Sequence, residues 1–347
     1  MSSKLRYLLA VSLFLVLLVV GSGAMEKPRS VAVDEQGSIY VLSGKGTWRF
    51  ELLKYSNRGR FIGILNKDLL KYWATDLKKY NAQKRELLEK TVYAQTLVFG
   101  ADGNIYALGD DIGGEPGMVS VIKLNDGKSL RSFSLIKGGK ANRLMLRDIA
   151  VDGKSNIYVT NYNEAPVQKY SSKGDFIMSI GEKGRGRGKL MSPAGIAVNK
   201  KTGDIYVSDL YVTRPMEIDL PQVGVKIFDK NGKYKGKLGN EFIRIKSFFP
   251  PIITFFWQNT LGYPESLAVS DDGYVYVLSK FFGPRVTKFA PNGWYVKEWG
   301  RAGSGPGEFN APEAICTDKH GNVYVADTGN DRVQKFDANG AFLMEIR

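Results

Sequence analysis

Charged and amide side chains recur at one position of a repeated pattern. An apolar triplet begins at Val31, Leu97, Ile149, Ile196, Leu267 and Ile315, and the residue two places earlier is Arg29, Gln95, Arg147, Ala194, Glu265 and Glu313. If the fold brings these residues into one ring, arginines face carboxylates across it, and such a ring can hold a small polar or zwitterionic ligand. The same charges could instead pair with each other, for example Glu313 with Arg29.

Two further carboxylates could turn part of this ring into a metal site. Asp209 and Asp327 each end a β-rich run that follows a triplet. Together with Glu265 and Glu313 they could supply oxygen ligands to Ca²⁺. Alternatively, Asp327 shapes its own loop by local hydrogen bonds. We expect no resident cofactor, with Ca²⁺ as the alternative.

Histidine and cysteine chemistry has little to build on. His320 is the only histidine and Cys316 the only cysteine. A zinc site with several histidine ligands cannot be assembled, and a Ser-His-Asp triad has no well-placed histidine. Cys316 occupies a position that alanine fills in other copies, which indicates a small packed residue.

The elements that position these residues repeat along the chain. Each apolar triplet precedes a polar turn, a run such as Ile205-Tyr206-Val207, a third run containing lysine, and a turn such as Asn292-Gly293. Tyrosine and β-branched residues bounded by glycine and aspartate are typical of short strands joined by tight turns. A repeat of this length indicates a solenoid or propeller, and four strands per copy favour a β-propeller.

Several segments resemble the NHL repeat, as found in exported bacterial proteins. These are Ile196–Val198, Val323–Asp327, Arg332–Asp337 and the linker Gly300–Phe309, of which Gly181–Leu190 is a basic version. The resemblance implies an all-β fold, a six-bladed β-propeller of four-stranded antiparallel blades over residues 25–347. Its expected blades are residues 28–65, 92–136, 143–181, 191–239, 263–300 and 310–347. Because this scaffold hosts both binding modules and enzymes, the resemblance implies no activity.

All long insertions fall in connections that share one face. Strand direction alternates within a blade, so the turns from strand one to two and from three to four lie on one face, and the remaining connections lie on the other. The short connections belong to the first class and every insertion to the second. Variable loops on a rigid scaffold commonly carry binding function, so we expect this second face to be the working face.

Two insertions on that face have distinctive compositions. Residues 66–91 show an apolar stripe at helical spacing and are expected to form a helix, either capping the propeller or meeting a partner or membrane surface. Residues 240–262 carry Phe248, Phe249, Phe255, Phe256 and Trp257. These aromatic residues form either a hydrophobic lid or a contact for a partner or membrane.

The N-terminus predicts export. Residues 1–24 contain Lys4 and Arg6, an apolar run over Tyr7–Val20 and the small residues Ser22-Gly23-Ala24. The pattern fits a signal peptide, and an uncleaved membrane anchor is the alternative. The net charge of +14 would suit an anionic partner, but export argues against nucleic acid.

Together these patterns predict an exported, non-catalytic binding or scaffolding propeller. Its expected partners are a protein or a cell-envelope polymer, with a membrane surface as a further possibility. The alternative is a metal-dependent hydrolase or lyase at the channel mouth.

Overall fold

The repeated runs form four-stranded antiparallel sheets. The computed structural model describes residues 25–45, 49–65, 92–111, 118–123, 129–134, 146–162, 166–209, 224–239, 264–280 and 283–347. Within these ranges there are six four-stranded sheets and one two-stranded sheet. The strands of the first three large sheets are β1 (Pro28–Val33), β2 (Ile39–Lys45), β3 (Arg49–Tyr55) and β4 (Phe61–Ile64); β5 (Val92–Phe99), β6 (Asn104–Asp111), β7 (Met118–Lys123) and β8 (Ser129–Ser134); β9 (Leu146–Val151), β10 (Ile157–Asn161), β11 (Val167–Tyr170) and β12 (Phe176–Ile180).

The C-terminal half continues the same order. A short parallel pair, β13 (Glu182–Lys183) and β14 (Lys189–Leu190), precedes the next large sheet. The remaining strands are β15 (Pro193–Val198), β16 (Ile205–Asp209), β17 (Gly224–Phe228) and β18 (Tyr234–Lys237); β19 (Pro264–Val269), β20 (Val275–Ser279), β21 (Arg285–Phe289) and β22 (Tyr295–Trp299); β23 (Ala314–Thr317), β24 (Val323–Asp327), β25 (Arg332–Phe336) and β26 (Phe342–Ile346).

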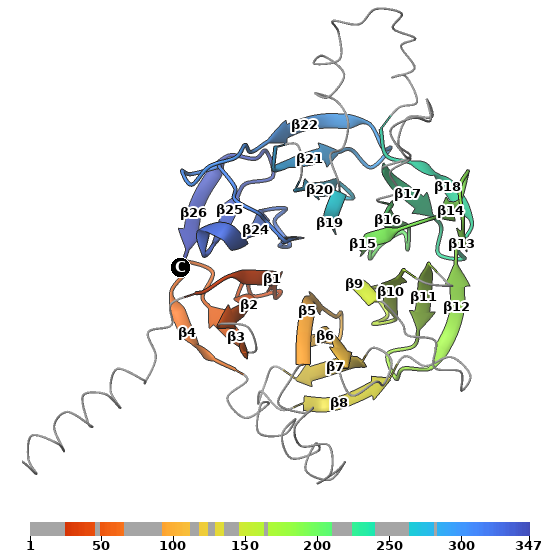
Figure 1. Cartoon of the computed structure of the whole chain (residues 1–347), viewed down its shortest axis with the longest axis horizontal. Helices are drawn as coiled ribbons and strands as arrows, with labels where there is room; N and C mark the ends of the chain where they lie inside the picture. The colour runs from red at the N-terminus through yellow and green to blue at the C-terminus, as the bar shows by residue number, and fades with distance from the viewer. Residues whose placement is uncertain are drawn as a thin grey trace, which may run out of the picture.

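The sheets stand around a central axis as the blades of a propeller (Figure 1). The first strand of each blade lies nearest the axis and the fourth lies at the rim. The prediction of an all-β propeller of four-stranded antiparallel blades is therefore confirmed. In the described residues the helical element is one 3₁₀ turn, η3 (Thr328–Asn330), and no described helix is long and apolar enough to span a bilayer. The segments 1–24, 66–91 and 240–262 lie outside the described residues.

Each second strand is buried on both faces because its blade packs between two others. All five residues of β10, β16, β20 and β24 are buried. Between the β9–β12 and β15–β18 blades, for example, Tyr158 packs with Ile196, Val207 and Phe228. Tyrosine and β-branched residues suit such two-sided burial, which is why these runs recur in the sequence.

A repeated polar contact fastens the first turn of a blade to its second and third strands. In the last blade, Asp318 Oδ2 accepts hydrogen bonds from the Tyr324 hydroxyl at 3.0 Å and from Asn322 Nδ2 at 2.8 Å. Lys335 Nζ lies 5.1 Å from the Tyr324 ring centroid and 3.9 Å from the same carboxylate oxygen. Asp152, Tyr158 and Lys169 repeat the arrangement. The recurrent aspartate, tyrosine and lysine are thus parts of the scaffold.

The turn between strands three and four requires glycine for two reasons. Gly340 has a φ of 79°, which side chains rarely adopt. A Cβ at this position would also lie 2.5 Å from Trp299 Cδ2 on the outer strand of the preceding blade. Gly59 and Gly232 likewise approach the outer strand of the preceding blade. These turns therefore set how closely successive blades pack.

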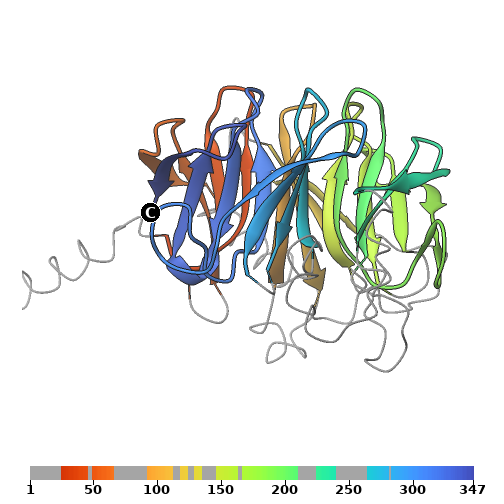
Figure 2. The same cartoon turned by 90° about the horizontal axis from the view of Figure 1, so that it is seen from above.

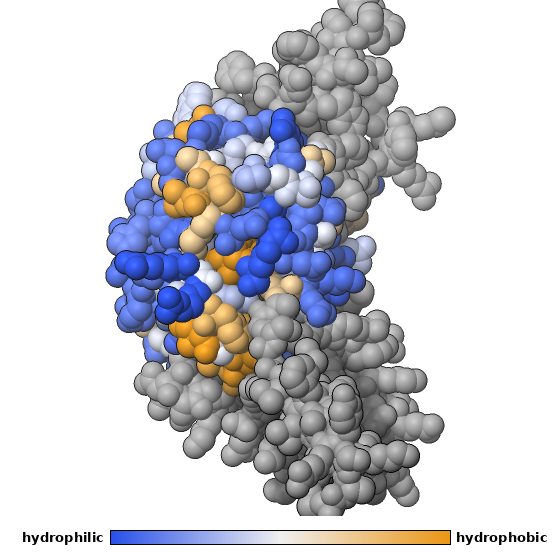
Figure 3. Space-filling view, turned by 90° about the vertical axis from the view of Figure 1, so that its left-hand side faces the viewer, coloured by the Kyte–Doolittle hydropathy of each residue, from blue (hydrophilic) through white to orange (hydrophobic). Residues whose placement is uncertain are grey.

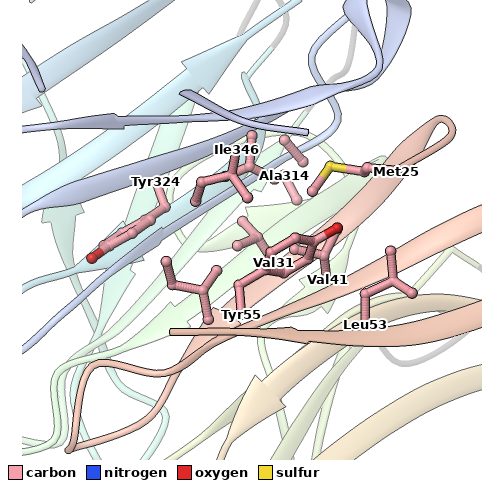
Figure 4. Close-up of a cluster of buried hydrophobic side chains, with 11 residues drawn as sticks. Met25, Val31, Val41, Leu53, Tyr55, Ala314, Tyr324 and Ile346 are labelled. Carbon is pink, nitrogen blue, oxygen red and sulfur yellow. The ribbon is translucent and has the colours of Figure 1, made fainter. Parts of the chain in front are cut away.

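The ring closes where the β1–β4 blade meets the β23–β26 blade, a contact that we call the seam. Met25, Val31 and Tyr55 pack there against Ala314 and Ile346 in one buried cluster (Figure 4). Polar contacts join the same elements: the Lys27 amide donates to Asp331 Oδ1 at 2.7 Å, and the Thr328 hydroxyl donates to the Pro28 carbonyl at 2.6 Å. Both blades supply their own four strands, so the termini share no blade.

The described turns are sorted by face as the strand alternation requires. The short turns between strands one and two and between strands three and four lie along the upper side in Figure 2. The outer side that carries β4 and β26 mixes charged residues with small apolar spots (Figure 3). Ile62 on β4 and Leu343 on β26 are 56% and 50% exposed. Isolated apolar residues of this kind are ordinary on protein surfaces.

Candidate functional site at the channel mouth

Five inner strands share an irregularity at the position that the sequence singles out. The register shifts between Pro28 and Ser30 in β1, between Ala94 and Thr96 in β5, opposite Thr160 in β9, between Pro193 and Ile196 in β15, and between Pro264 and Ser266 in β19. In each case the inner strand holds one residue more than its partner, which is a β-bulge. The residues in these bulges include Arg29, Gln95, Arg147, Ala194 and Glu265.

The residue after the bulged position joins one blade to the next. Ser30 Oγ accepts the Leu97 amide at 2.9 Å, and Ser266 Oγ accepts the Ile315 amide at 3.3 Å. Asp148 Oδ2 accepts the Ile196 amide at 2.9 Å. These contacts connect neighbouring inner strands, so the bulges are held in place by the closed ring rather than by their own blades alone.

The predicted ring residues differ in exposure. Arg29 and Arg147 are exposed, whereas Glu265 and Glu313 are partly buried and Ala194 is 5% exposed. Gln95 takes the bulged place in β5, and its side chain lies outside the described part of the structure. Mixed charges therefore occur at equivalent positions of the inner strands, with arginines that reach solvent and carboxylates that are more enclosed.

Three charged residues of other blades act on the pKa of Glu313. Lys280 Nζ lies 3.8 Å from Glu313 Oε1. Burial raises the pKa of the Glu313 carboxyl, the positive charges of Lys280 and Arg29 lower it, and the negative charge of Glu265 raises it; the net direction is upward. The expected interaction between Glu313 and Arg29 is thus electrostatic, and Lys280 is an additional partner that the sequence did not indicate.

Asp148 is a second charged group that sequence reasoning missed. Burial raises its pKa to about 6, against the opposing effect of the Ile196 and Ile149 amides that it accepts. The Glu265 charge raises it further. Asp148 directly precedes an apolar triplet, so its place was visible, but its reach to the next blade was not. With Asp148 and Lys280 added, each side of the ring carries both signs.

Asp209 does not fit a metal-ligand role, because its carboxylate is already used. It accepts the Met191 amide at 3.1 Å and the Ser192 amide at 2.7 Å, and Lys226 Nζ donates to it at 2.9 Å. The residue is 1% exposed. It therefore fixes the chain that enters β15.

Asp327 has the corresponding role in the last blade. Its Oδ1 accepts the Asn310 amide at 2.7 Å, and its Oδ2 accepts Arg332 Nε at 2.9 Å and Gln334 Nε2 at 3.0 Å. Within the described ranges, no three histidine, cysteine, aspartate or glutamate residues lie close enough to hold a metal ion together. The predicted four-carboxylate set is therefore not assembled, and only Glu265 and Glu313 remain at the mouth.

The predicted aromatic contact residues Phe248, Phe249, Phe255, Phe256 and Trp257 lie outside the described residues. His320 is exposed in a turn of the last blade, away from the bulged positions. Cys316 is partly buried, and burial raises the pKa of its thiol, as expected for a packing residue.

Comparison with known proteins decides the family. The family described as NHL repeat matches residues 309–336, which run from the end of a linker through β25. Residues 309–336 thus carry an NHL repeat. Human NHL repeat-containing protein 3 is 37% identical over 76 residues, which is 21% of this chain and 22% of that protein. Mouse peptidyl-glycine alpha-amidating monooxygenase is 33% identical over 97 residues, 26% of this chain and 10% of that protein.

The chain spans less than a quarter of the length of these curated relatives. A solved structure agrees over a larger part of the chain. A protein of unknown function from Bacteroides thetaiotaomicron superposes with a TM-score of 0.59 at 14% identity, covering 91% of this chain and 70% of that one. At this identity the likeness shows the fold alone and leaves the activity open.

Proposed function

We propose that this chain is an exported, non-catalytic binding or scaffolding propeller with a ring of six blades. Its ligand is a small polar molecule, a polysaccharide or a segment of a protein, recognised on the face that carries the long connections. The support for a mouth site is the bulge that recurs in five inner strands where the charged residues occur. Bulges re-aim side chains and are common beside binding sites.

The ring chemistry favours a ligand that carries both charges. Arg29 and Arg147 offer exposed guanidinium groups to a carboxylate. Glu313 offers a carboxylate whose contact with Lys280 is as long as 3.8 Å, so an ammonium group of a ligand has room to improve on it. In the β15–β18 blade the equivalent position holds the buried Ala194, so this blade contributes no large or charged side chain there.

A calorimetric titration tests this proposal. The full chain is titrated with lysine, which carries ammonium and carboxylate groups, and with a neutral disaccharide. We expect binding of at least one of them, weakened about tenfold or more in Glu313→Gln and Arg29→Gln, because each variant removes one charge contact of about 1–3 kcal/mol. Lys201→Gln, which changes an exposed turn residue, is the control. Equal affinity of all variants would show that Glu313 and Arg29 do not bind the ligand.

A second candidate function has one observation in its favour. The charge of Glu265 raises the pKa of both Asp148 and Glu313, so these carboxylates of three blades influence one another, although in the described residues they do not form a ready group of three metal ligands. A divalent cation bound there would support a hydrolase or lyase activity. Titration of the full chain with Ca²⁺ and Mg²⁺, repeated on Glu265→Gln, separates the two candidates. If neither ion produces a heat of binding, the metal-dependent candidate is excluded and the binding function is retained.

Export remains a proposal that rests on residues 1–24. The described structure begins with Met25, whose side chain is buried in the seam at 4% exposure. Processing after Ala24 would therefore leave the seam residues in place. Cell fractionation of the full chain and of a chain lacking residues 2–24 tests it, and an equal distribution of the two proteins would exclude a role for this segment.

A further inference from the structure

Two links between blades share one pattern of backbone pairing. They are the segments Gly181–Leu190 and Gly300–Phe309, which precede β15 and β23. The Gly184 amide donates to the Leu190 carbonyl at 3.2 Å, and the Gly303 amide donates to the Phe309 carbonyl at 3.1 Å. In both links the two ends pair in parallel. The links are therefore two copies of one loop, in which Lys189 corresponds to Glu308 and Glu182 to Arg301.

In the second link a carboxylate fills the centre of the loop. Glu308 Oε2 accepts the Gly305 amide at 2.8 Å, while its Oε1 accepts a hydrogen bond from Arg301 Nε at 2.8 Å and forms an ion pair with Arg301 Nη2 at 2.7 Å. The Gly305 amide and then the Arg301 side chain hold the pKa of Glu308 below its usual range. This loop is thus an anion site whose anion belongs to the chain itself.

The first link keeps the loop and loses the anion. Lys189 stands where Glu308 would be, and its Nζ lies 3.3 Å from Glu182 Oε2, so the ion pair has reversed polarity. A Cβ added to Gly305 would lie 3.1 Å from Glu308 Oε2, whereas one added to Gly186, the corresponding glycine, would meet no atom within 4 Å. The two glycines differ in backbone, since Gly186 has a φ of 116° and Gly305 has no positive φ. The space beside Gly186 is open.

The first link is rich in positive charge. Lys183, Arg185, Arg187 and Lys189 are all exposed, and Glu182 is the single acid of the link. Lys183 Nζ also donates to the Tyr162 carbonyl at 3.0 Å. The link packs on the start of β18, where a Cβ on Gly188 would lie 3.0 Å from Tyr234 Cβ. The site thus carries a larger positive charge than its counterpart, whose Arg301 and Glu308 cancel.

We propose that the Gly181–Leu190 link binds a phosphate group, with the phosphate in the place that the Glu308 carboxylate fills in the other link. The counterpart of this loop already binds a carboxylate in the same chain, so the shared pairing supplies a frame for an anion. Arg187 and Lys189 supply the charge, and arginine suits the geometry of phosphate oxygens. The excess positive charge selects a phosphomonoester dianion over a monoanionic carboxylate. This site lies on the link between two blades and is separate from the channel mouth.

The decisive variant gives the first link the charges of the second. Glu182→Arg with Lys189→Glu leaves the net charge unchanged and retains an ion pair, but it places a carboxylate in the loop. The matched control reverses another surface pair, the partly buried Asp204 with the exposed Lys235, whose Nζ–oxygen distance is 2.8 Å. Asp204→Lys with Lys235→Asp also leaves the net charge unchanged. Thermal melts of both variants verify that they fold.

The full chain and both double variants are titrated with inorganic phosphate, with glycerol 3-phosphate and with acetate. We expect phosphate and glycerol 3-phosphate to bind more tightly than acetate, and the Glu182→Arg/Lys189→Glu variant to bind phosphate about tenfold or more weakly, with the control unchanged. Arg187→Ser should weaken binding several-fold. Vesicles containing phosphatidic acid test a lipid source: binding that follows the same variants supports the site. Equal phosphate affinity in all variants, or vesicle binding without binding of either small phosphate, overturns the proposal.

Discussion

Arg332 and Asp327 form an ion pair that solvent scarcely reaches. Arg332 Nε lies 2.9 Å from Asp327 Oδ2, and the two side chains are 1% and 0% exposed. Arg332 further donates to Glu345 and to the carbonyls of Gly305 and Glu308. One guanidinium thus joins β24, the Gly300–Phe309 link and the outermost strand β26.

Removal of the acid from this pair should destabilise the protein strongly. Asp327→Ala leaves the buried Arg332 with less compensating charge and removes the acceptor of the Asn310 amide. We expect a loss of about 3–5 kcal/mol in the free energy of unfolding, measured by chemical denaturation. Asp204→Ala, which breaks a more exposed pair, should cost about 1 kcal/mol or less. Similar losses in the two variants would contradict the assigned role.

The turn glycines allow steric contact to be separated from backbone strain. Gly340 and Gly321 have φ values of 79° and 77°. A Cβ on Gly340 would lie 2.5 Å from Trp299, whereas one on Gly321 would lie 3.5 Å from its nearest neighbour, Ala338 Cβ. Gly321→Ala should therefore cost about 1–2 kcal/mol from strain alone.

Gly340→Ala should cost about 1–3 kcal/mol more than Gly321→Ala, because the indole must also move. Denaturation midpoints of the two variants, compared with that of the unchanged protein, give the difference. If Gly321→Ala is the more destabilising of the two, the contact with Trp299 is not what requires glycine at position 340.

The pH dependence of stability should contain a contribution from Asp148. Its pKa rises from the ordinary value of 3.8 to about 6 on folding, so the folded protein binds this proton more tightly than the unfolded chain does. The stabilisation from this group is complete below about pH 4 and is lost as the pH rises through about 6. Because the side chain is only partly buried, we expect about 1–2 kcal/mol.

Asp148→Asn removes this titration. The difference in unfolding free energy between pH 4 and pH 7 should therefore change by about 1–2 kcal/mol relative to the unchanged protein, in the direction of greater relative stability at pH 7. Urea denaturation at both pH values measures it. Parallel pH profiles for the two proteins would show that Asp148 does not titrate in this range.

The seam should depend on Met25. This side chain is 4% exposed and packs in the cluster that joins the first and last blades. Met25→Ala should cost about 2–4 kcal/mol, as for other buried methionines. Met344→Ala alters a partly buried residue at the border of the same cluster and should cost less. A loss below about 1 kcal/mol for Met25→Ala would show that the seam does not need it.

The sequence predicted the blades because their strands follow local rules. The Ile-Tyr-Val runs and the turns with glycine mark each strand, and their repetition indicates a propeller. The ring positions of Arg29 and Glu265 also follow from repetition. The sequence did not predict the bulges, because an extra residue in one strand is defined only by its pairing with the other. Asp148 and Lys280 were missed for a related reason: each acts on a group of another blade.

The proposed metal ligands show the opposite limit. Asp209 and Asp327 end their strands at equivalent places, which makes them look like one set. Each carboxylate instead accepts hydrogen bonds from backbone amides of the segment that leads into its blade and from one cationic side chain, Lys226 or Arg332. Equivalent positions in a repeat do not meet at one point unless their side chains are aimed at the axis, and a linear pattern carries no information on that aim.

The absence of a shared blade gives the ring a weak point that can be located. Many contacts inside a blade connect residues close in sequence, but the seam connects Lys27 with Asp331 and Pro28 with Thr328, at opposite ends of the chain. A force that pulls the two ends of the propeller apart would act on these contacts first. The first and last blades would then separate from their neighbours before the blades between them. In mechanical terms the ring is a linear array of blades whose closure depends on the seam between the first and last blades.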